Sequence, residues 1–585
     1  MPPLDTDVLV VGAGPVGLTA SALLARDGVD AVTVTKHAGT HPTPRAVYTN
    51  QRTMEILRDL GIEDEARRAG VPIDRVGGNV WATSFPGVEL ARMPAWGTGL
   101  ARRADYEAAS PSRTHTAPQH VLEPILLAAA RRLGADVRFG TELTGIEQDG
   151  DGVTATVRDR ETGAERALRA RYAIGADGGR STVAARSGFA YEGETGIMNW
   201  AANVWLEADL TQYCAHRPAL MYCVYEPGED FHSNTWICIR PWSEWVMSII
   251  FSGSRDRPGL DGAEALAYAR RMIADTDVPV RIKGISTWSV DKGLATEYRR
   301  GRIFLAGDAA HRHPPPNGLG SNTGVQDAYN LCWKLAKVLN GQAGPALLDT
   351  YHAERRPVGE RVVDRAMQSL LDMEPMVDAL GLHPDLDAQA GWAKLDELAA
   401  ADGRGRKRRA MLREALELQE YHYNAHGVEY GQRYDVPGAA VVADGGEPPE
   451  PVRDPQLYYQ PSTYPGHPLP HAWVQRDGTP LSTLDLAGRG EFTLITGIGG
   501  ELWLDAAAQA SAALGVPIAT AVVDYRREYH DPCGDWAALR EIDETGCLLV
   551  RPDRHIAWRA DARPAEAAEA EAALADALRR VLARG

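Results

Sequence analysis

Residues 301–336 read GRIFLAGDAAHRHPPPNGLGSNTGVQDAYNLCWKLA. The apolar run from Arg302 to Ala306 predicts a strand, and apolar residues at helical spacing predict a helix from about Asn322 onward. A strand that runs through a loop rich in proline and glycine into a helix presents unpaired backbone N–H groups and the positive end of a helix dipole. The pattern predicts a site for an anion or a carbonyl oxygen, with Asp308 suited to the hydroxyl groups of ribose or ribitol. A plain βα crossover is the alternative for this stretch taken alone.

The N-terminus shows a second pattern of this kind. An apolar run at residues 7–11 leads into GAGPVG (residues 12–17), a predicted helix and a second strand that ends at Thr35. In this βαβ context the pattern indicates dinucleotide binding, because its glycines allow a tight turn, close approach of a pyrophosphate and packing of the helix on the strand. No acidic residue closes the second strand, where Thr35 and Lys36 stand instead. Ribose binding must therefore use a hydroxyl group or a residue from elsewhere in the chain.

A third segment lies between these two. Residues 172–177 predict a strand that ends in Asp177-Gly178-Gly179-Arg180-Ser181. This segment again places a carboxylate and flexible backbone at the C-terminal end of a strand. Three segments far apart in the sequence therefore predict the same kind of ligand.

Composition limits the classes of protein to which the chain can belong. Its 585 residues suggest three or four domains. A net charge of −17 argues against nucleic acid and against an anionic membrane surface as partners. No apolar run approaches the roughly 20 residues of a membrane span, and the N-terminus lacks the regions of a signal peptide. The six cysteines show neither a C-x-x-C pair nor zinc spacing, so we expect a cytoplasmic protein with free thiols and no metal site.

The rest of the chain divides into regions with different sequence patterns. Alternating, aromatic-rich segments between residues 191 and 290 predict a mainly antiparallel sheet, in which most aromatic side chains form the core and the rest line a pocket. Helices are predicted from Pro345 to Tyr423, a proline-rich linker at residues 437–470, and alternating strands and helices at residues 481–582. The fold class is therefore α/β, with a Rossmann-like nucleotide-binding domain, an inserted antiparallel sheet, a helical segment and a C-terminal α/β domain.

Several motifs resemble a known family. GDAAHRHPPP (307–316) runs into NTGVQDAYNLCWKLA (322–336), and the C-terminal part carries LPHAW (469–473), STLDL (482–486) and VRPD (550–553). Together with GAGPVG and Asp177-Gly178, they resemble the single-component FAD-dependent aromatic hydroxylases of the para-hydroxybenzoate hydroxylase class. Within that class, the chain is most similar to the phenol and 2,4-dichlorophenol hydroxylase branch. The resemblance covers nearly the whole chain.

The resemblance implies a domain plan. The FAD-binding domain would comprise residues 1–75, 105–190 and 291–365, and the substrate-binding domain residues 76–104 and 191–290. A helical segment (366–430) and a linker (431–480) would precede a thioredoxin-like domain (481–585). Because that last domain has no C-x-x-C pair, we expect it to be structural and not a redox module.

The resemblance also assigns residues to FAD, which should bind tightly but non-covalently. Gly12, Gly14 and Gly17 would cradle the pyrophosphate, Asp308 would bind the ribityl region, and the backbone at 319–322 would meet the pyrimidine ring. Asp177 and Gly178 would also serve NAD(P)H. The full set of expected FAD contacts is Val11, Gly12, Gly14, Pro15, Val16, Gly17, Thr35, Lys36, Arg45, Gln119, Asp177, Gly307, Asp308, Pro315, Gly318, Gly320, Ser321 and Asn322.

The implied reaction is hydroxylation of a phenol or of a hydroxylated heteroaromatic ring such as a hydroxypyridine. NADPH or NADH would reduce the FAD, and a flavin C4a-hydroperoxide would deliver one atom of O2 to the ring, close to the carbonyl of Pro315. The protein would position the ring, exclude water and deprotonate the phenol. The expected partners are a small aromatic substrate, O2 and NAD(P)H, and a homo-oligomer is expected.

Two departures from the family pattern bear on the site. An Arg that is usual a few residues after Asp177-Gly178 is Ala184 here, and Arg186 is the nearest candidate. The Asp that serves phenol hydroxylases as the substrate's base is Val47 here. The base has therefore moved, or the substrate is acidic enough to need none.

The candidates for the replacement base are His232, Tyr222, Tyr225 and His313, and His232 is the one predicted here. In an alternating strand it falls in one set with Asn234 and Trp236, while Ser233 and Thr235 form the other, and the first set combines polar groups with an aromatic wall. The expected catalytic residues are Pro315 and His232. The expected substrate contacts are Tyr222, Tyr225, His232, Asn234, Trp236 and His313.

Other functions remain open at this point. Epoxidation or a Baeyer–Villiger oxidation of a polyketide-like intermediate could use the same flavin. A flavin halogenase is less favoured, because no W-x-W-x-I-P run is present. A non-catalytic nucleotide-binding carrier belongs to a different class, and the intact Pro/Gly loop argues against it.

Overall fold

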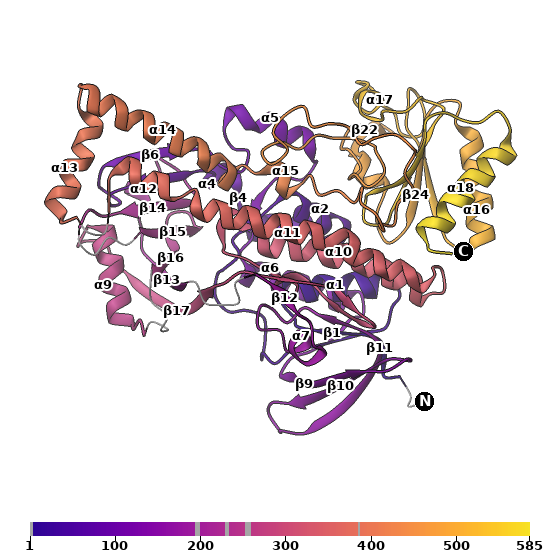
Figure 1. Ribbon diagram of the computed structural model, residues 1–585, viewed down its shortest axis with the longest axis horizontal. Helices are drawn as coiled ribbons and strands as arrows, with labels where there is room; N and C mark the ends of the chain where they lie inside the picture. The colour runs from indigo at the N-terminus through magenta and orange to yellow at the C-terminus, as the bar shows by residue number, and fades with distance from the viewer. Residues whose placement is uncertain (1–3, 194–198, 229–232, 252–258, 384–385, 585) are drawn as a thin grey trace.

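A computed structural model describes residues 4–193, 199–228, 233–251, 259–383 and 386–584. Two long helices, α10 (Leu319–Leu339) and α11 (Thr350–Leu371), run through the centre of the molecule. An aromatic-rich sheet with its helices lies on one side of them and a C-terminal domain on the other (Figure 1). None of the described helices is long and apolar enough to span a membrane.

The largest sheet brings the three predicted segments to one edge. β1 (Thr6–Val11) lies between β2 (Ala31–Val34) and β11 (Glu165–Gly175), and β20 (Ile303–Leu305) follows β11, all four in parallel. Val11 is level with Gly175, and Gly175 with Leu305. Because the C-terminal ends of parallel strands meet at one edge, the residues that follow these strands gather there.

Helix α10 begins at Leu319, three residues before the predicted start, and follows Gly318, whose left-handed backbone has a φ of 66°. Helix α1 (Pro15–Arg26) packs against α10. The other elements around this sheet are α6 (Gln119–Arg132), β8 (Asp136–Arg138), β9 (Thr141–Gln148), β10 (Val153–Asp159), α7 (Thr182–Ser187) and β19 (Arg299–Arg300).

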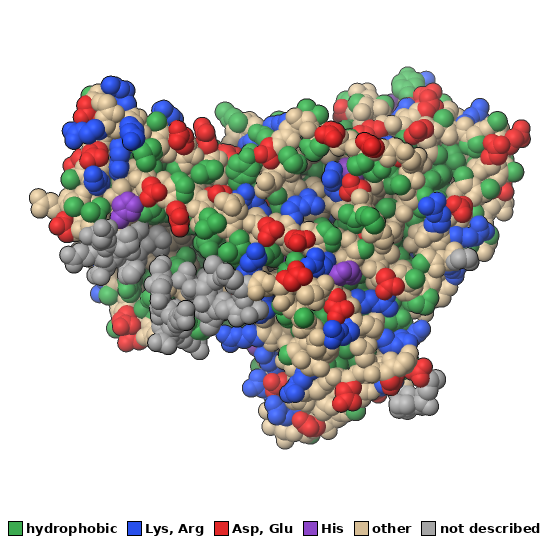
Figure 2. Space-filling model, viewed as in Figure 1, with side chains coloured by type: hydrophobic (Ala, Val, Ile, Leu, Met, Phe, Trp, Pro, Cys, Tyr) green, Lys and Arg blue, Asp and Glu red, His purple; other side chains and the backbone are tan. Residues whose placement is uncertain are grey.

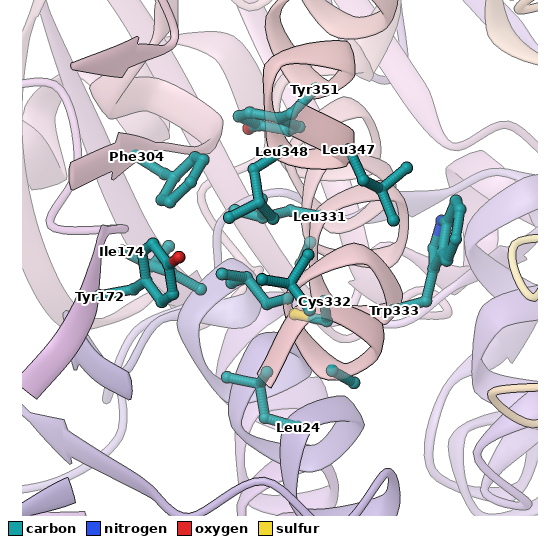
Figure 3. Close-up of a cluster of buried hydrophobic side chains, with 14 of the residues drawn as sticks. Leu24, Tyr172, Ile174, Phe304, Leu331, Cys332, Trp333, Leu347, Leu348 and Tyr351 are labelled. Carbon is teal, nitrogen blue, oxygen red and sulfur yellow. The ribbon is translucent and has the colours of Figure 1, made fainter. Parts of the chain in front are cut away.

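A buried apolar core holds α10 against the sheet. Figure 3 shows Tyr172 and Ile174 of β11 and Phe304 of β20 beside Leu331 and Cys332 of α10. All five side chains are almost fully buried. Burial of one such side chain contributes about 1.5–3 kcal/mol, so this contact fixes the position of α10 and of its N-terminus relative to the strand ends.

The aromatic-rich region forms a seven-stranded sheet in the order β17–β13–β16–β15–β14–β5–β6. Neighbours pair antiparallel except β14 and β5, which confirms the predicted mainly antiparallel sheet. Helix α9 (Gly262–Ile273) packs against it. The strands are β5 (Asn79–Ala82), β6 (Glu89–Met93), β13 (Asn199–Glu207), β14 (Met221–Tyr225), β15 (Ser233–Arg240), β16 (Glu244–Phe251) and β17 (Arg281–Val290).

Helices follow α11, as the sequence predicts. The basic run that starts at Arg404 lies in the first turns of α14, where Arg404, Arg406 and Lys407 are exposed. Figure 2 shows basic side chains at this end of the molecule and interspersed acidic and basic side chains over the rest of the visible face. The helices are α12 (Glu374–Leu380), α13 (Ala388–Ala399), α14 (Gly403–Tyr423) and α15 (His426–Glu429).

The C-terminal domain has a thioredoxin-like sheet in the order β25–β24–β26–β27. β25 is parallel to β24, whereas β26 is antiparallel to both β24 and β27, and helices α16 and α18 pack together. A hairpin, β22 (Trp473–Arg476) and β23 (Thr479–Ser482), precedes it and crosses the predicted boundary at residue 480 between linker and C-terminal domain. The other bounds are β24 (Phe492–Thr496), α16 (Glu501–Leu514), β25 (Ile518–Val522), α17 (Asp535–Leu539), β26 (Cys547–Val550), β27 (Ile556–Ala560) and α18 (Ala567–Val581).

A buried ionic network joins this domain to the centre of the molecule. Both guanidinium Nη atoms of Arg551 donate to Glu354 of α11, at 2.7 and 2.8 Å, and Nη2 also donates to Asp553 at 2.6 Å. Lys334 of α10 donates to the same Glu354 at 2.7 Å. All four side chains are buried. Removal of one partner from such a network leaves a buried charge uncompensated, so the charges tie the C-terminal domain to α10 and α11.

Candidate active site

The turn after β1 cannot take a side chain at two of its glycines. Gly12 has a φ of 109°, and a Cβ there would lie 2.2 Å from the carbonyl oxygen of Ala176. A Cβ on Gly17 would lie 1.9 Å from the carbonyl oxygen of Gly12, whereas Gly14 has 3.9 Å of free space to Glu123 Oε1. Helix α1 begins at Pro15, so its first turn offers backbone N–H groups and a positive dipole end to a phosphate.

At the end of β2, Thr35 is buried and Lys36 is exposed. Thr35 Oγ1 accepts a hydrogen bond from the backbone N–H of His37 at 3.4 Å. A carboxylate nevertheless stands near this turn, because the buried side chain of Glu123 in α6 approaches Gly14. Each of its carboxylate oxygens accepts one hydrogen bond from the protein and has capacity for another. Glu123 can therefore accept a hydrogen bond from a ribose hydroxyl group.

Arg45 and Gln119 come together through the backbone, where the Gln119 N–H donates to the Arg45 carbonyl at 2.9 Å. The Gln119 side-chain amide donates to Glu123 Oε1. The other oxygen of Glu123 accepts from the backbone N–H of His41 at 2.5 Å. These contacts hold the loop around Arg45 against the start of α6.

Asp177 uses its carboxylate to hold the start of α7. Its Oδ1 accepts from the Ser181 hydroxyl at 2.5 Å, and its Oδ2 accepts from the backbone N–H groups of Thr182 and Val183 at 2.6 and 3.1 Å. Burial raises the pKa of Asp177 above its ordinary value, although these hydrogen bonds oppose the effect. The next residue, Gly178, has a φ of 79°, and a Cβ there would meet no atom of the described residues within 4 Å, so the turn is open on this side.

The guanidinium beside this turn belongs to Arg312. Its Nη1 donates to the carbonyl of Gly179 at 2.8 Å, and its guanidinium carbon lies 4.6 Å from the centre of the Tyr191 ring. Arg186, the nearest candidate by sequence, is exposed in α7. A cation from β21 (His311–Arg312) therefore stands beside the Asp177 turn, where the resemblance implies an Arg close in sequence.

Asp327 of α10 holds the turn at Gly307-Asp308 through hydrogen bonds. Asp327 Oδ2 accepts from the Gly307 N–H at 2.9 Å and is 2.8 Å from His311 Nε2, while Oδ1 accepts from Arg355 at 2.7 Å. Burial would raise the pKa of Asp327, but Arg355 and His311 outweigh it and hold that pKa below its ordinary value. Asp308 is exposed, so its carboxylate is available to a ligand.

The Pro/Gly loop is held by its asparagine. Asn317, with a φ of 68°, donates from Nδ2 to the carbonyls of Tyr421 and His422 at 2.7 and 2.9 Å, which binds the loop to the end of α14. Pro315 is exposed, and its carbonyl accepts from the Gly318 N–H at 3.1 Å. That carbonyl therefore has one remaining position for a substrate or cofactor contact.

His313 and Gly320 lie beside Asp308. A Cβ on Gly320 would be 3.7 Å from both Asp308 Oδ1 and His313 Nε2. Burial lowers the pKa of His313, and its Nδ1 is 2.6 Å from the carbonyl oxygen of Pro314. His313 therefore lies near the predicted ribityl contact, at the start of α10, and not on the aromatic sheet.

At the start of α10, Ser321 is partly buried and the side chain of Asn322 is used within the protein. Asn322 Oδ1 accepts from the Asn50 N–H and the Thr53 hydroxyl at 3.0 and 2.8 Å, and Nδ2 donates to Tyr48 and Gly318. The Asn322 side chain is therefore not free for a flavin ring, and the backbone of this turn is the part that the resemblance assigns to the ring.

The predicted substrate contacts divide between the two faces of the sheet. Asn234 Nδ2 is 3.5 Å from Met272 Sδ of α9, and Trp236 packs edge-on against Phe85 and Trp245. Tyr222, level with Trp236, packs in the same aromatic cluster. Their assignment to a flavin-facing pocket is therefore corrected: Tyr222, Asn234 and Trp236 belong to the core between the sheet and α9. His232 lies outside the described residues.

The opposite face of the sheet leads to the Pro/Gly loop. It carries Cys223 and Thr235, with Sγ and Oγ1 4.0 Å apart, and, by alternation, Tyr225. Trp81 is level with Cys223, and its ring centre is 6.2 Å from that of Tyr423. From Tyr423 a run of rings continues to Trp96 at 5.7 Å and on to Tyr48 at 5.1 Å.

Tyr48 ends this run of aromatic rings at the loop. A Cβ on Gly318 would lie 2.9 Å from Tyr48 Cδ1, so the ring packs directly against the loop backbone. An aromatic wall therefore extends from the sheet to the N-terminus of α10. Each of its four rings is almost fully buried.

Comparison with known proteins agrees with this geometry. The family described as FAD binding domain matches residues 5–366, and the family described as aromatic-ring hydroxylase, C-terminal, matches residues 462–585. The chain is 47% identical to 2,4-dichlorophenol 6-monooxygenase of Cupriavidus pinatubonensis over 99% of this chain and 97% of that protein. It is 43% identical to phenol 2-monooxygenase of a Pseudomonas species, over 98% and 92%. The crystal structure of the flavin-dependent monooxygenase PieE in complex with FAD and substrate superimposes with a TM-score of 0.95 at 44% identity, over 100% of both chains.

The chain belongs to the FAD-dependent aromatic-ring hydroxylases. Its cofactor is FAD, and the glycine cradle, the exposed Asp308 and the free backbone at the start of α10 fit that cofactor. The predicted family, fold class and cofactor are therefore confirmed.

Sequence reasoning missed four residues that shape this site: Glu123, Arg312, Asp327 and Arg355. Glu123 and Arg355 reach the site from helices that carry no motif of their own, whereas Arg312 stands within the quoted run GDAAHRHPPP. Asp327 stands in the quoted family motif, and its place on the buried side of a helix was a signal, because a buried carboxylate needs partners.

Proposed function

We propose that this protein uses FAD, NAD(P)H and O2 to hydroxylate a phenol or a hydroxylated heteroaromatic ring. The observation that carries the proposal is the run of aromatic rings from Trp81 to Tyr48, which ends against the Pro/Gly loop beside the predicted flavin site. The FAD, when bound, supplies the activated oxygen. The chain's own part is to bind the ring in a fixed orientation next to it and to keep bulk water away.

Named residues carry these roles. The backbone at Gly12, Gly14 and Gly17 binds the pyrophosphate with the N-terminus of α1, and Asp308 binds the ribityl hydroxyls. Trp81, Trp96 and Tyr423 form the wall against which the substrate ring packs, in place of Trp236 and Tyr222. The Pro315 carbonyl and the backbone N–H groups at Leu319–Asn322 complete the flavin-facing edge.

The structure removes the reason for predicting His232 as the residue that accepts the substrate's proton. The prediction of His232 depends on the alternating set that it shares with Asn234 and Trp236, and those two residues face α9. That reason therefore no longer supports His232. Val47 is buried and apolar, so it cannot take the proton either.

A panel of phenols and hydroxypyridines tests this function. We expect at least one member to stimulate NAD(P)H oxidation by the holoenzyme and to yield a product heavier by one oxygen atom, in which NMR shows a second ring hydroxyl. Stimulation without such a product, or a ring-opened or ester product, would contradict hydroxylation.

The electron donor, oligomeric state and location belong to the same proposal. Parallel assays with NADH and NADPH identify the donor, and light scattering of the holoenzyme tests the expected homo-oligomer. Cell fractionation tests the expected cytoplasmic location.

A further inference from the structure

A buried polar cluster lies directly behind the Pro/Gly loop. It consists of Tyr48, Trp96, Tyr106 and Glu429, which come from β3 (Tyr48–Thr49), the loop before α5 (Leu100–Ala109), α5 itself and α15. The Tyr48 hydroxyl donates to Glu429 Oε2 at 2.5 Å, and both side chains are almost fully buried. Because the Tyr48 ring also packs on Gly318, this hydrogen bond lies one side chain away from the predicted flavin site.

Some buried polar atoms of this cluster lack a hydrogen-bond partner among the described residues. Within the part of the chain that the structure describes, three of its buried atoms have no protein hydrogen-bond partner: Glu429 Oε1, the Tyr106 hydroxyl and Trp96 Nε1. Buried polar atoms in folded proteins are almost always paired, and ordered water supplies the partner where the protein does not. Each of the three atoms is therefore a candidate for a hydrogen bond with bound water.

Glu429 is the member of the cluster that titrates near neutral pH. Burial raises its pKa to about 8, against the opposing effects of the Tyr48 hydrogen bond and of Arg102. Burial raises the pKa values of Tyr48 and Tyr106 well above 10 and lowers that of His426 to about 3, so these three side chains stay neutral. Glu420 of α14, whose side chain is 34% exposed, lies 3.6 Å from Arg102 and not in the cluster.

The proposed reaction needs a proton acceptor, because a phenolate is more electron-rich than a phenol, and Val47 occupies the position at which the family carries its base. We propose that Glu429, acting through Tyr48 and through water held in this cluster, accepts the proton of the substrate's hydroxyl group. This inference rests on the proposed function. It makes Glu429 a positioning and proton-accepting residue that does not itself touch the substrate.

The step balances without a further reactant. The substrate's O–H bond breaks, and its proton passes to a cluster water, which passes a proton to the Tyr48 oxygen. Tyr48 transfers its own proton along the existing hydrogen bond to Glu429 Oε2. The substrate becomes a phenolate and the carboxylate becomes a neutral carboxyl, so charge is conserved and no electron moves.

The test is the pH profile of hydroxylation from pH 6 to 10 for the wild-type holoenzyme and the Glu429→Gln variant. Glutamine still accepts the Tyr48 hydrogen bond but does not titrate. We expect the wild-type rate of product formation to rise through an apparent pKa between 7 and 9. We expect the Glu429→Gln rate to lack this rise and to be on the order of 100-fold lower at pH 9.

Two further variants separate the proton pathway from a structural effect. Tyr48→Phe removes the hydroxyl that links Glu429 to the site and should abolish the same rise. Glu420→Gln removes a neighbouring carboxyl outside the cluster and should keep it. Each variant is first checked for FAD content by absorbance, and if Glu429→Gln fails to fold, Tyr48→Phe decides by the same criterion.

The outcomes are distinguishable from a failure of the proposed function. If the wild-type enzyme hydroxylates no phenol or hydroxypyridine, the proposed function is wrong. If it hydroxylates one but shows no rise between pH 7 and 9, or if Glu429→Gln and Tyr48→Phe keep the rise, the relay through Glu429 is wrong while the function stands.

Discussion

Replacement of Glu429 by glutamine should change stability in a pH-dependent way, even without substrate. Folding raises the pKa of this carboxyl from 4.5 to about 8. A carboxyl whose pKa is raised by folding contributes its full stability at a pH below its pKa in the unfolded chain, where it is neutral in both states. That stability is lost as the pH rises from the pKa in the unfolded chain to the pKa in the folded protein. At about 1.4 kcal/mol per pH unit, the loss amounts to roughly 5 kcal/mol by pH 9.

Glutamine does not titrate, so the free energy of unfolding of the variant should increase relative to that of the wild type as the pH rises. Urea titrations of both holoproteins at pH 5, 6, 7, 8 and 9 measure the difference in the free energy of unfolding. We expect Glu429→Gln to become more stable relative to wild type by roughly 4 kcal/mol between pH 5 and pH 9, with most of the change below pH 8. Glu417→Gln, on the exposed surface of α14, controls for the loss of one carboxylate. A constant difference, or one that falls with pH, would refute the burial argument for Glu429.

Three other predictions test the cofactor site and the domain contact. Asp308→Ala should give folded protein with FAD affinity lower by about 10- to 100-fold, because a charge-assisted hydrogen bond contributes about 1.5–3 kcal/mol; full FAD occupancy in the purified variant would show that this role is wrong. Gly318→Ala puts a Cβ 2.9 Å from Tyr48 at a φ of 66° and should weaken FAD retention on gel filtration, whereas Gly341→Ala, also at a positive φ but with no atom within 4 Å, should not. Glu354→Gln should lower the free energy of unfolding by about 3–5 kcal/mol, because Arg551 and Lys334 lose their shared partner. Cleavage of residues 437–470 by protease should then become faster than in Glu360→Gln, which changes an exposed carboxylate on the same helix; equal rates would contradict it.

Local patterns predict the cofactor side of the site well. The turn at Gly12 is specified by its own glycines, and parallel pairing alone brings it beside Asp177 and Gly307. The predicted start of α10 is three residues late, because its first turn contains Gly320 and has no side-chain cap to mark it. A sequence pattern that depends on side chains could not show that the helix begins at Leu319.

The substrate side depends on contacts that no local pattern contains. Alternation correctly divides β15 into two sets of side chains, but the packing of α9 decides which set faces the core. Arg312 approaches Gly179 across 133 positions of the chain, and Tyr48 meets Glu429 across 381. Arg312 and Gly179 stand in quoted motifs and Tyr48 and Glu429 do not, but in neither pair does the sequence show that the two residues meet, so only the folded structure identifies the contact.

Long-range contacts also connect the C-terminal domain, which has no C-x-x-C pair, to the helices near the predicted flavin site. Helix α2 (Gln51–Asp59) begins beside Asn322, since Asn50 and Thr53 bond to that side chain at the flavin edge. Arg52 of the same helix donates to the Asp553 carbonyl at 3.0 Å, and Asp59 at its end accepts from Arg554 at 3.1 Å. Asn330 of α10 also donates to the Asp553 carboxylate, at 3.3 Å. Because α2 and α10 both contact the C-terminal domain through buried polar groups, that domain holds the two helices whose N-terminal ends adjoin the Pro/Gly loop. We therefore expect this domain to act by fixing the position of the loop.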